Sequence, residues 1–198
     1  MAVLRSAMLW LAREPRAEEL IRRSRFSRPL VQRFVAAEDL AGALEKVQAL
    51  HSIGLTTTLD LLGENVDDER LAVAARGAYI ETLDAMLRAG LPANISIKLT
   101  MLGLDISDEL TWENIEAIVQ HAARHDAFVR IDMEGWAYTD RTLALFRRIH
   151  DKHPAAVGIV LQSYLYRTDR DLDEMIERKA RVRIVKGAYK EPDWIAWP

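Results

Sequence analysis

The sequence has no cysteine, no excess of basic residues and no long uncharged apolar run. Without cysteine, the chain has no disulfides, no thiolate nucleophile and no cysteine-ligated zinc or iron–sulfur site. The formal net charge of -3 argues against a nucleic-acid partner, because phosphate binding usually shows as a basic excess. No uncharged stretch approaches the roughly 20 residues of a membrane span. The apolar fraction of 49% and the charged fraction of 29% are typical of a soluble globular protein, and the absence of cysteine fits a cytosolic setting.

The histidines show no metal-binding motif. His121 and His125 have the spacing of two zinc ligands on a helix, but the glutamate that zincins place after the first histidine is replaced by Ala122. A solvated helix face is therefore the preferred interpretation, and we expect no metal site.

The first 53 residues are predicted to be mostly helical. Three segments carry this prediction, at residues 6–13, 17–25 and 37–51, and the apolar residues of the third recur every three or four positions. The apolar start of the chain also raises the question of a signal peptide. An amphipathic helix is preferred, because Arg5 interrupts the run and no small-residue cleavage site follows.

Strands and helices alternate in the rest of the chain. β-Branched and apolar runs predict strands, and segments with helical periodicity lie between them, the second opening at a candidate cap, Thr111. The predicted strands are 56–62, 93–99, 127–133, 157–163 and 181–187, and the predicted helices are 68–89, 111–125, 140–153 and 168–177.

This alternation predicts an α/β fold with a parallel sheet. Two architectures fit it, an open doubly wound sheet and a (β/α)8 barrel. No glycine-rich phosphate fingerprint follows any predicted strand, which counts against a dinucleotide-binding Rossmann domain.

Polar side chains gather at the C-terminal ends of the predicted strands. This edge is where ligands bind in both candidate architectures. Burying each charge costs several kcal/mol unless it is paired, so repeated charges at strand ends favour a functional rim over isolated ion pairs. The residues concerned are Asp60, Glu64, Lys98, Thr100, Asp132, Glu134, Gln162, Tyr164, Arg167, Arg183, Lys186 and Tyr189.

Some of these residues, and the neighbouring Arg130, have alternative interpretations. Lys98 and Asp132 could form only an ion pair that joins two strands. Strict alternation places Arg183 and Lys186 on opposite faces, so either one of them is structural or a local irregularity brings both to the rim. Arg130 shares a face with Asp132 and could pair with a neighbouring carboxylate without any role in chemistry.

Several segments together resemble the monofunctional bacterial proline dehydrogenases. The most specific are KGAY after a basic strand, LQSY and LDLLGE, which occur in the family's order and spacing. The resemblance covers essentially the whole chain and is carried by LDLLGENV (59–66), ISIKLTMLGLDIS (95–107), VRIDMEG (129–135), IVLQSYLYRT (159–168) and RIVKGAYKEP (183–192).

The resemblance implies a distorted (β/α)8 barrel that carries FAD at its C-terminal rim. Residues 1–53 would form the family's N-terminal helical arm, and residues 54–198 the first five strand units of the barrel. The implied reaction is oxidation of L-proline to Δ1-pyrroline-5-carboxylate, the first step of proline degradation, with electrons passed to a membrane quinone. The implied location is cytoplasmic, with a peripheral position at the inner face of the membrane as a further option.

The resemblance also implies roles around the substrate. Lys98 would neutralise the proline carboxylate. Asp132 would be a catalytic residue near that lysine and would help to hold the substrate-binding arrangement. Arg183 would act in catalysis and bind the cofactor near flavin N5, the atom that receives hydride. Tyr189 would line the substrate pocket.

A second group of residues would bind the cofactor. Met133 and Gln162 would contact the flavin, with Gln162 at the polar edge of the ring. Lys186, Gly187 and Ala188 would complete the cofactor site, and Gly187 would allow close approach of the backbone.

The family barrel has eight strands, and this sequence supplies five. It resembles a C-terminally truncated member that lacks the helix with paired arginines for the proline carboxylate. We therefore expect the 198-residue chain to bind FAD weakly or not at all and not to turn over proline. Two alternatives stay open: a non-catalytic remnant that associates with itself or a partner, and a Schiff-base lyase that uses Lys98 or Lys186.

Overall fold

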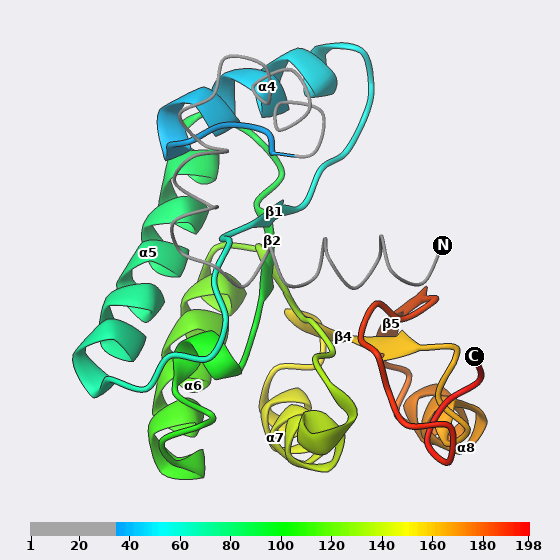
Figure 1. Cartoon of the computed structure of the whole chain (residues 1–198). Coiled ribbons are helices and arrows are strands. Elements are labelled where there is room, and N and C mark those ends of the chain that lie inside the picture. The colour runs from blue at the N-terminus through cyan, green and yellow to red at the C-terminus, as the bar shows by residue number, and fades with distance from the viewer. Residues whose placement is uncertain (1–34) are drawn as a thin grey trace, which may run out of the picture. The chain divides into compact units, whose positions relative to one another are not determined.

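The computed structural model describes residues 35–198, and residues 47–198 form one compact unit (Figure 1). The first described helix, α4 (Leu40–Ser52), confirms the helix predicted over 37–51. The helices predicted at 6–13 and 17–25 lie outside the described residues. Among the described helices, none has the length and apolarity that crossing a membrane requires.

Five parallel strands form a single sheet in which spatial order follows sequence order. A doubly wound sheet would reverse its strand order part-way, whereas a barrel winds in one direction. The order therefore decides between the two predicted architectures in favour of the barrel type. The strands are β1 (Leu59–Asp60), β2 (Asn94–Ile97), β3 (Phe128–Ile131), β4 (Val157–Gln162) and β5 (Arg181–Val185).

The sheet curves strongly, as a contact between β2 and β5 demonstrates. Arg183 of β5 donates a hydrogen bond to Ser96 Oγ of β2 at 2.9 Å, although two strands lie between them. In a flat sheet these strands would be about 14 Å apart, at about 4.8 Å for each step. The two side chains meet because the sheet bends around them, as the wall of a barrel does.

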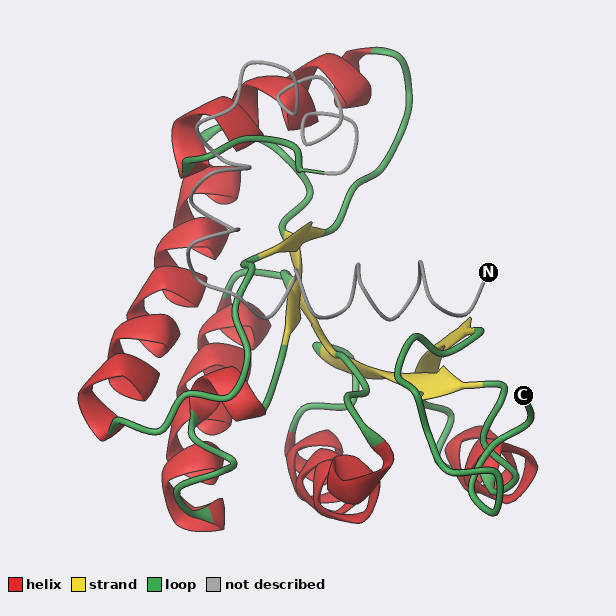
Figure 2. Ribbon diagram, in the orientation of Figure 1, coloured by secondary structure: helices red, strands yellow, loops and turns green. Residues whose placement is uncertain are grey.

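Helices follow the strands on one side of the sheet (Figure 2). The second of the predicted βα helices begins earlier than expected. Its N-cap is Ser107, whose Oγ accepts a hydrogen bond from Leu110 N at 3.1 Å, so the prediction of Thr111 as the cap was wrong. The four helices are α5 (Glu69–Arg88), α6 (Asp108–Arg124), α7 (Thr139–Lys152) and α8 (Thr168–Glu177).

Strand β1 is much shorter than its predicted range of 56–62. Only Leu59 and Asp60 pair with β2, opposite Ile95 and Ser96. Threonine-rich sequence favours extended backbone, but a strand also needs a partner along its whole length. Two short 3₁₀ helices, η1 (Thr100–Leu102) and η2 (Trp136–Tyr138), follow β2 and β3 and were not predicted.

The two faces of the sheet differ in composition. Side chains alternate along each strand, so one set points outward to the helices and the other points to the concave side. The outward set is apolar and at most 2% exposed, and it consists of Ile95, Ile97, Val129, Ile131, Val157, Ile159 and Leu161. The concave set includes Asp60, Ser96, Lys98, Asp132 and Arg183.

Candidate active site

A pocket of about 580 Å³ lies at the C-terminal ends of the strands, the edge at which barrels bind their ligands. Its size lies within the range of small-molecule and cofactor sites. Glu64, Val160 and Val185 contribute to its wall. The other lining residues are the nine that the sequence predicted for the site: Lys98, Asp132, Met133, Gln162, Arg183, Lys186, Gly187, Ala188 and Tyr189.

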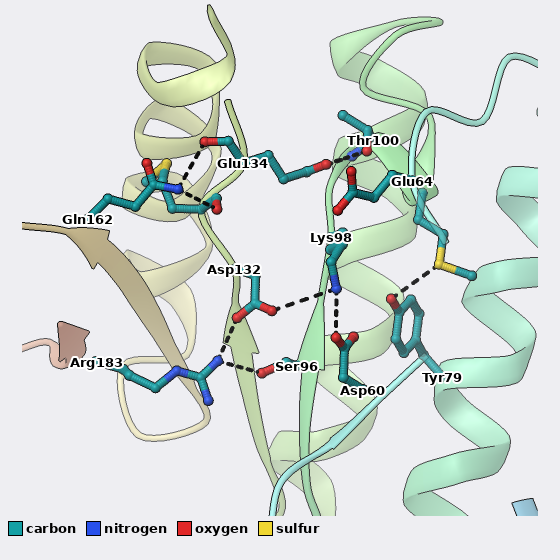
Figure 3. A network of polar contacts seen from close by, with 12 residues as sticks. Asp60, Glu64, Tyr79, Ser96, Lys98, Thr100, Asp132, Glu134, Gln162 and Arg183 are labelled. Atoms are coloured by element: carbon teal, nitrogen blue, oxygen red, sulfur yellow. Dashed lines mark hydrogen bonds and ion pairs between the residues drawn. The ribbon is translucent and has the colours of Figure 1, made fainter. Parts of the chain in front are cut away.

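Lys98 lies between two carboxylates (Figure 3). Its Nζ is 2.6 Å from Asp60 Oδ2 and 3.8 Å from Asp132 Oδ2. Burial lowers the pKa of Lys98, but the hydrogen bond and charge of Asp60, with the charges of Asp132 and Glu64, outweigh burial and raise the pKa above its ordinary value. The predicted pair of Lys98 with Asp132 is present, but Asp60 is the closer partner.

Asp132 also joins Lys98 to Arg183. Asp132 Oδ1 accepts a hydrogen bond from Arg183 Nη2 at 2.6 Å, and the same nitrogen reaches Ser96 Oγ. Arg183 Nε is buried and has no hydrogen-bond partner among the described residues. The guanidinium is thus anchored through one nitrogen and keeps an unused donor beside the pocket.

Gln162 crosses from β4 to the end of β3. Its Nε2 donates to Met133 O at 3.0 Å and, more weakly, to Glu134 O at 3.3 Å (Figure 3). The side chain is 2% exposed, and its Oε1 has no hydrogen-bond partner in the described part of the chain. This buried acceptor is available to a ligand that carries an N–H group, since buried polar atoms rarely stay unpaired.

Glu134 is a buried carboxylate directly beyond β3. It accepts hydrogen bonds from the backbone N–H of Thr100, at 3.1 Å, and from the Thr100 hydroxyl. Burial raises the pKa of Glu134, the charge of Glu64 acts in the same direction, and the bonds from Thr100 oppose the shift. Glu134 therefore ties the loop after β2 to the loop after β3 rather than facing the pocket lining.

The segment after β5 brings Lys186 to the rim. Alternation places Arg183 and Val185 on the same face of β5. The strand ends at Val185, so alternation no longer determines the side of Lys186, which also lines the pocket. The predicted local irregularity is therefore the alternative that the structure confirms. Gly187 has φ of +110°, and a Cβ there would lie 2.2 Å from the Tyr164 ring, so close packing as well as backbone conformation requires glycine.

Tyr189 closes the pocket on the side of the loop after β1. Its hydroxyl lies 3.2 Å from Glu64 Oε1 and donates to it. Burial raises the pKa of Tyr189, and the charges of Glu64 and Glu134 add to the shift, so the phenol keeps its proton at neutral pH.

Arg130 does not fit the predicted pairing with a carboxylate. No described carboxylate lies within salt-bridge distance, and its Nη1 is buried without a hydrogen-bond partner among the described residues. Its guanidinium lies over the Phe128 ring, 5.0 Å from the ring centre. Burial lowers the pKa of Arg130, and the charges of Arg183 and Arg181 lower it further.

Asp60 and Ser96 were not assigned roles from sequence. The sequence places Asp60 at a strand end but does not indicate that it is the nearer partner of Lys98. The usable signal was alternation, because Ser96 precedes Lys98 by two positions on the same face and pairs in register with Asp60.

A family model described as proline dehydrogenase matches residues 43–195. The chain belongs to the proline dehydrogenase family. Two curated relatives are "Proline dehydrogenase 2" of Bacillus subtilis (strain 168), 36% identical over 172 residues, and "Proline dehydrogenase" of Deinococcus radiodurans, 36% identical over 198 residues. These matches cover 87% and 98% of this chain but only 56% and 63% of the relatives, so the chain spans little more than half their length.

Solved structures agree with the fold. Proline utilization A (PutA) from Bdellovibrio bacteriovorus superposes with a TM-score of 0.74 at 24% identity, over 81% of this chain and 20% of that protein. PutA from Corynebacterium freiburgense gives 0.67 at 23% identity, over 81% and 19%. The predicted barrel-type α/β fold of this proline dehydrogenase family member is thereby confirmed.

The pocket fits the FAD that membership of the family implies. An isoalloxazine ring carries both acceptor and N–H donor edges, and the pocket offers a buried acceptor, Gln162 Oε1, and a buried donor, Arg183 Nε, each without another partner in the described residues. Lys186 adds a cation at the same rim. A cofactor with negative charge to stabilise suits this donor set.

Proposed function

We propose that this protein oxidises L-proline to Δ1-pyrroline-5-carboxylate with FAD as the cofactor and a membrane quinone as the final electron acceptor. The observation that carries the proposal is one pocket in which the buried Gln162 Oε1 and Arg183 Nε both lack protein partners in the described chain, beside the cation of Lys98. The names of the curated relatives and the matching family support the same reaction.

The residues on one side of the pocket would bind the substrate, and those on the other side would bind the cofactor. Lys98 would bind the substrate carboxylate, which places the ring carbon next to nitrogen in a fixed position. Arg183, anchored to Asp132, would hold positive charge beside the cofactor, and Gln162 would orient the ring through its free oxygen. FAD, when bound, supplies the hydride acceptor that no side chain can supply.

Met133, Gly187 and Ala188 would complete the cofactor site, and Tyr189 would wall the substrate side. These roles rest on the position of each residue in the lining of the pocket. Tyr189 keeps its phenolic proton and so adds no negative charge near the substrate carboxylate.

Flavin titration tests the cofactor part of the proposal. We expect Gln162→Leu to weaken the binding of FAD about tenfold or more, because it removes the buried acceptor Gln162 Oε1. Gln120→Leu, at an exposed position of α6, is the matched control and should leave the affinity unchanged. Equal FAD affinity in wild type and Gln162→Leu would contradict the assignment of this edge of the pocket.

Anaerobic reduction tests the substrate part. We expect L-proline, but not D-proline, to bleach the absorbance of the bound flavin near about 450 nm. A chain saturated with FAD that L-proline leaves oxidised would rule out the proposed reaction for this pocket.

The Schiff-base lyase is the weaker alternative. A lysine nucleophile needs a lowered pKa, so that the amine is neutral. Asp60 and Asp132 raise the pKa of Lys98 instead. Borohydride reduction in the presence of a carbonyl substrate should therefore give no stable adduct at Lys98, and an adduct at Lys98 or Lys186 would revive this alternative.

One observation favours the second alternative, self-association of a non-catalytic chain. In the described sheet, β1 and β5 each pair with one strand only, and Ile184 of β5 is 48% exposed. Unpaired strand edges invite pairing with another chain. Size-exclusion chromatography with light scattering should show concentration-dependent dimers or larger species, and a monomer at all concentrations would argue against it.

The division into an arm of residues 1–53 and a barrel of residues 54–198 belongs to the same proposal. So does a cytoplasmic location with a peripheral position at the inner membrane face, since a quinone acceptor resides in the bilayer. Separation of cell extracts into soluble and membrane fractions would test the location.

A further inference from the structure

Lys98 has one close protein partner, and that partner is Asp60. The Nζ atom lies 2.6 Å from Asp60 Oδ2, within hydrogen-bond distance, but 3.8 Å from Asp132 Oδ2, beyond it. Asp132 in turn gives its other oxygen to Arg183 at 2.6 Å. Lys98 and Arg183 therefore each have a nearest carboxylate of their own: Asp60 for Lys98, and Asp132 for Arg183.

This arrangement leaves part of the Lys98 ammonium free for a ligand. An ammonium group has three N–H donors, and a single one is used by Asp60. The Lys98 side chain is only 14% exposed, so it would be costly to keep its charge without a nearby anion. Without Asp60, the closest remaining carboxylate would be that of Asp132, which already holds Arg183.

We propose that Asp60 is the positioning residue that keeps Lys98 charged and directed into the pocket, so that Lys98 can receive the carboxylate of a small amino-acid substrate. This inference rests on the proposed function and adds a residue of the first strand to its substrate site. Asp60 does not touch the ligand in this scheme and acts through Lys98.

The charged groups around Lys98 come from four elements. Asp60 lies on β1, Asp132 directly follows β3, Arg183 lies on β5, and Glu64 lies in the loop after β1 (Figure 3). From α5, the Tyr79 hydroxyl donates to Met101 Sδ at 3.4 Å, and burial raises the pKa of Tyr79, so this phenol brings no charge. Asp60 is the only one of these groups with a hydrogen bond to Lys98.

Trace acetylation of the lysines across pH tests the proposal on the ligand-free chain. The labelling rate of each lysine follows its fraction of neutral amine, and peptide mass spectrometry reads each site separately. In Asp60→Asn, which keeps the shape and removes the charge, we expect Lys98 to label about tenfold faster near about pH 9, while the other lysines stay unchanged. Unchanged labelling of Lys98 would overturn the proposal.

Two further variants exclude a simple loss of folding. Asp60→Glu restores the charge and should return Lys98 to slow labelling, which an unfolded chain would not do. Asp67→Asn changes an exposed carboxylate in the loop after β1 and should label as the wild type does. Fast labelling of every lysine in Asp60→Asn, without recovery in Asp60→Glu, would show a structural role only and would also overturn the proposal.

Substrate dependence completes the test. With FAD bound, Asp60→Asn should raise the L-proline concentration for half-maximal flavin bleaching by about tenfold or more, and the effect should grow as pH rises. If L-proline does not bleach the wild type, the proposed function fails while the labelling result still decides the role of Asp60. If the wild type is bleached and Asp60→Asn behaves identically, the function stands and the role of Asp60 is refuted.

Discussion

The two faces of the sheet are formed by the same strands, but the outer face is part of the apolar core and the inner face carries the charged residues of the pocket. On β3, Ile131 points outward and is fully buried among apolar side chains, whereas the next residue, Asp132, points inward and contacts two cations. At the end of β2, Ile97 and the next residue, Lys98, repeat this contrast. Consecutive residues thus belong to different parts of the molecule, one to the apolar core and the next to the charged pocket.

The difference teaches where stability and reactivity can be changed independently. Burial of apolar area on the outer face stabilises the fold at about 25 cal/mol for each Å². On the inner face, Lys98, Asp132 and Arg183 each have a partner of opposite charge, so their net contribution to stability is small while their positions matter for ligands. Substitutions on the two faces should therefore give distinguishable results.

The largest effect is expected on the outer face. Ile131→Ala should lower the free energy of unfolding by about 2–5 kcal/mol, because it removes buried methyl groups and leaves a cavity. Ile176→Ala, at a position 64% exposed, should change it by less than about 0.5 kcal/mol. Urea unfolding followed by circular dichroism measures both, and equal losses would break the comparison between the two faces.

The inner face of the sheet is tightly packed around Gly158. A Cβ there would lie 2.4 Å from the Arg181 carbonyl oxygen and 2.7 Å from Phe128 Cζ, so Gly158→Ala should cost about 1–3 kcal/mol or more. Gly77→Ala is the matched control, because nothing lies within 4 Å of its Cβ and the site is inside α5. It should stabilise by about 0.5–1 kcal/mol, and a loss in both variants would point to a general intolerance of alanine.

Glu134 should make stability depend on pH. Its pKa is raised in the folded state, so the folded chain holds the proton more tightly than the unfolded chain does. That stabilisation is present at low pH and is lost as pH rises through the raised value. The free energy of unfolding of Glu134→Gln, relative to wild type, should therefore increase from about pH 4 upward and then level off.

Unfolding curves at several pH values measure this difference. Asp60 also has a pKa raised by burial, but it contributes equally to both proteins and cancels. A relative stability that stays flat or falls with pH would show that Glu134 is not the buried group responsible.

The smallest effect is expected at the rim. Tyr189→Phe removes a hydroxyl that donates to Glu64 and should lower stability by less than about 1 kcal/mol, while it changes the L-proline dependence of flavin bleaching. Tyr166→Phe removes an exposed hydroxyl that donates to Asp193 O, outside the pocket lining, and should change neither property. An L-proline dependence that Tyr189→Phe leaves unchanged, as in Tyr166→Phe, would place Tyr189 outside the site.

Most of the fold could be predicted because its signals are local. The order of strands and helices, and the start of β4 at Val157, follow from runs of apolar residues whose periodicity the backbone imposes. The predictions were wrong where the bounds of an element depend on contacts that its own sequence pattern does not show. Strand β1 is short because β2 pairs with it over two residues only, and α6 begins at Asp108 because Ser107 caps it before Thr111.

The sequence by itself determined most of the residues that line the pocket, because polar residues at the ends of strands are a local property, but it left open whether Lys186 is one of them. Only the tertiary structure decided which of them meet. Lys98 contacts Asp60, which lies 38 positions away in the sequence. Arg183 contacts Asp132 and Ser96, which lie 51 and 87 positions away. These contacts depend on strand register and on the curvature of the sheet, which arise from packing of the whole unit. The Lys98 site expected from sequence thus becomes a pair of cations with separate carboxylates, one of them on the first strand.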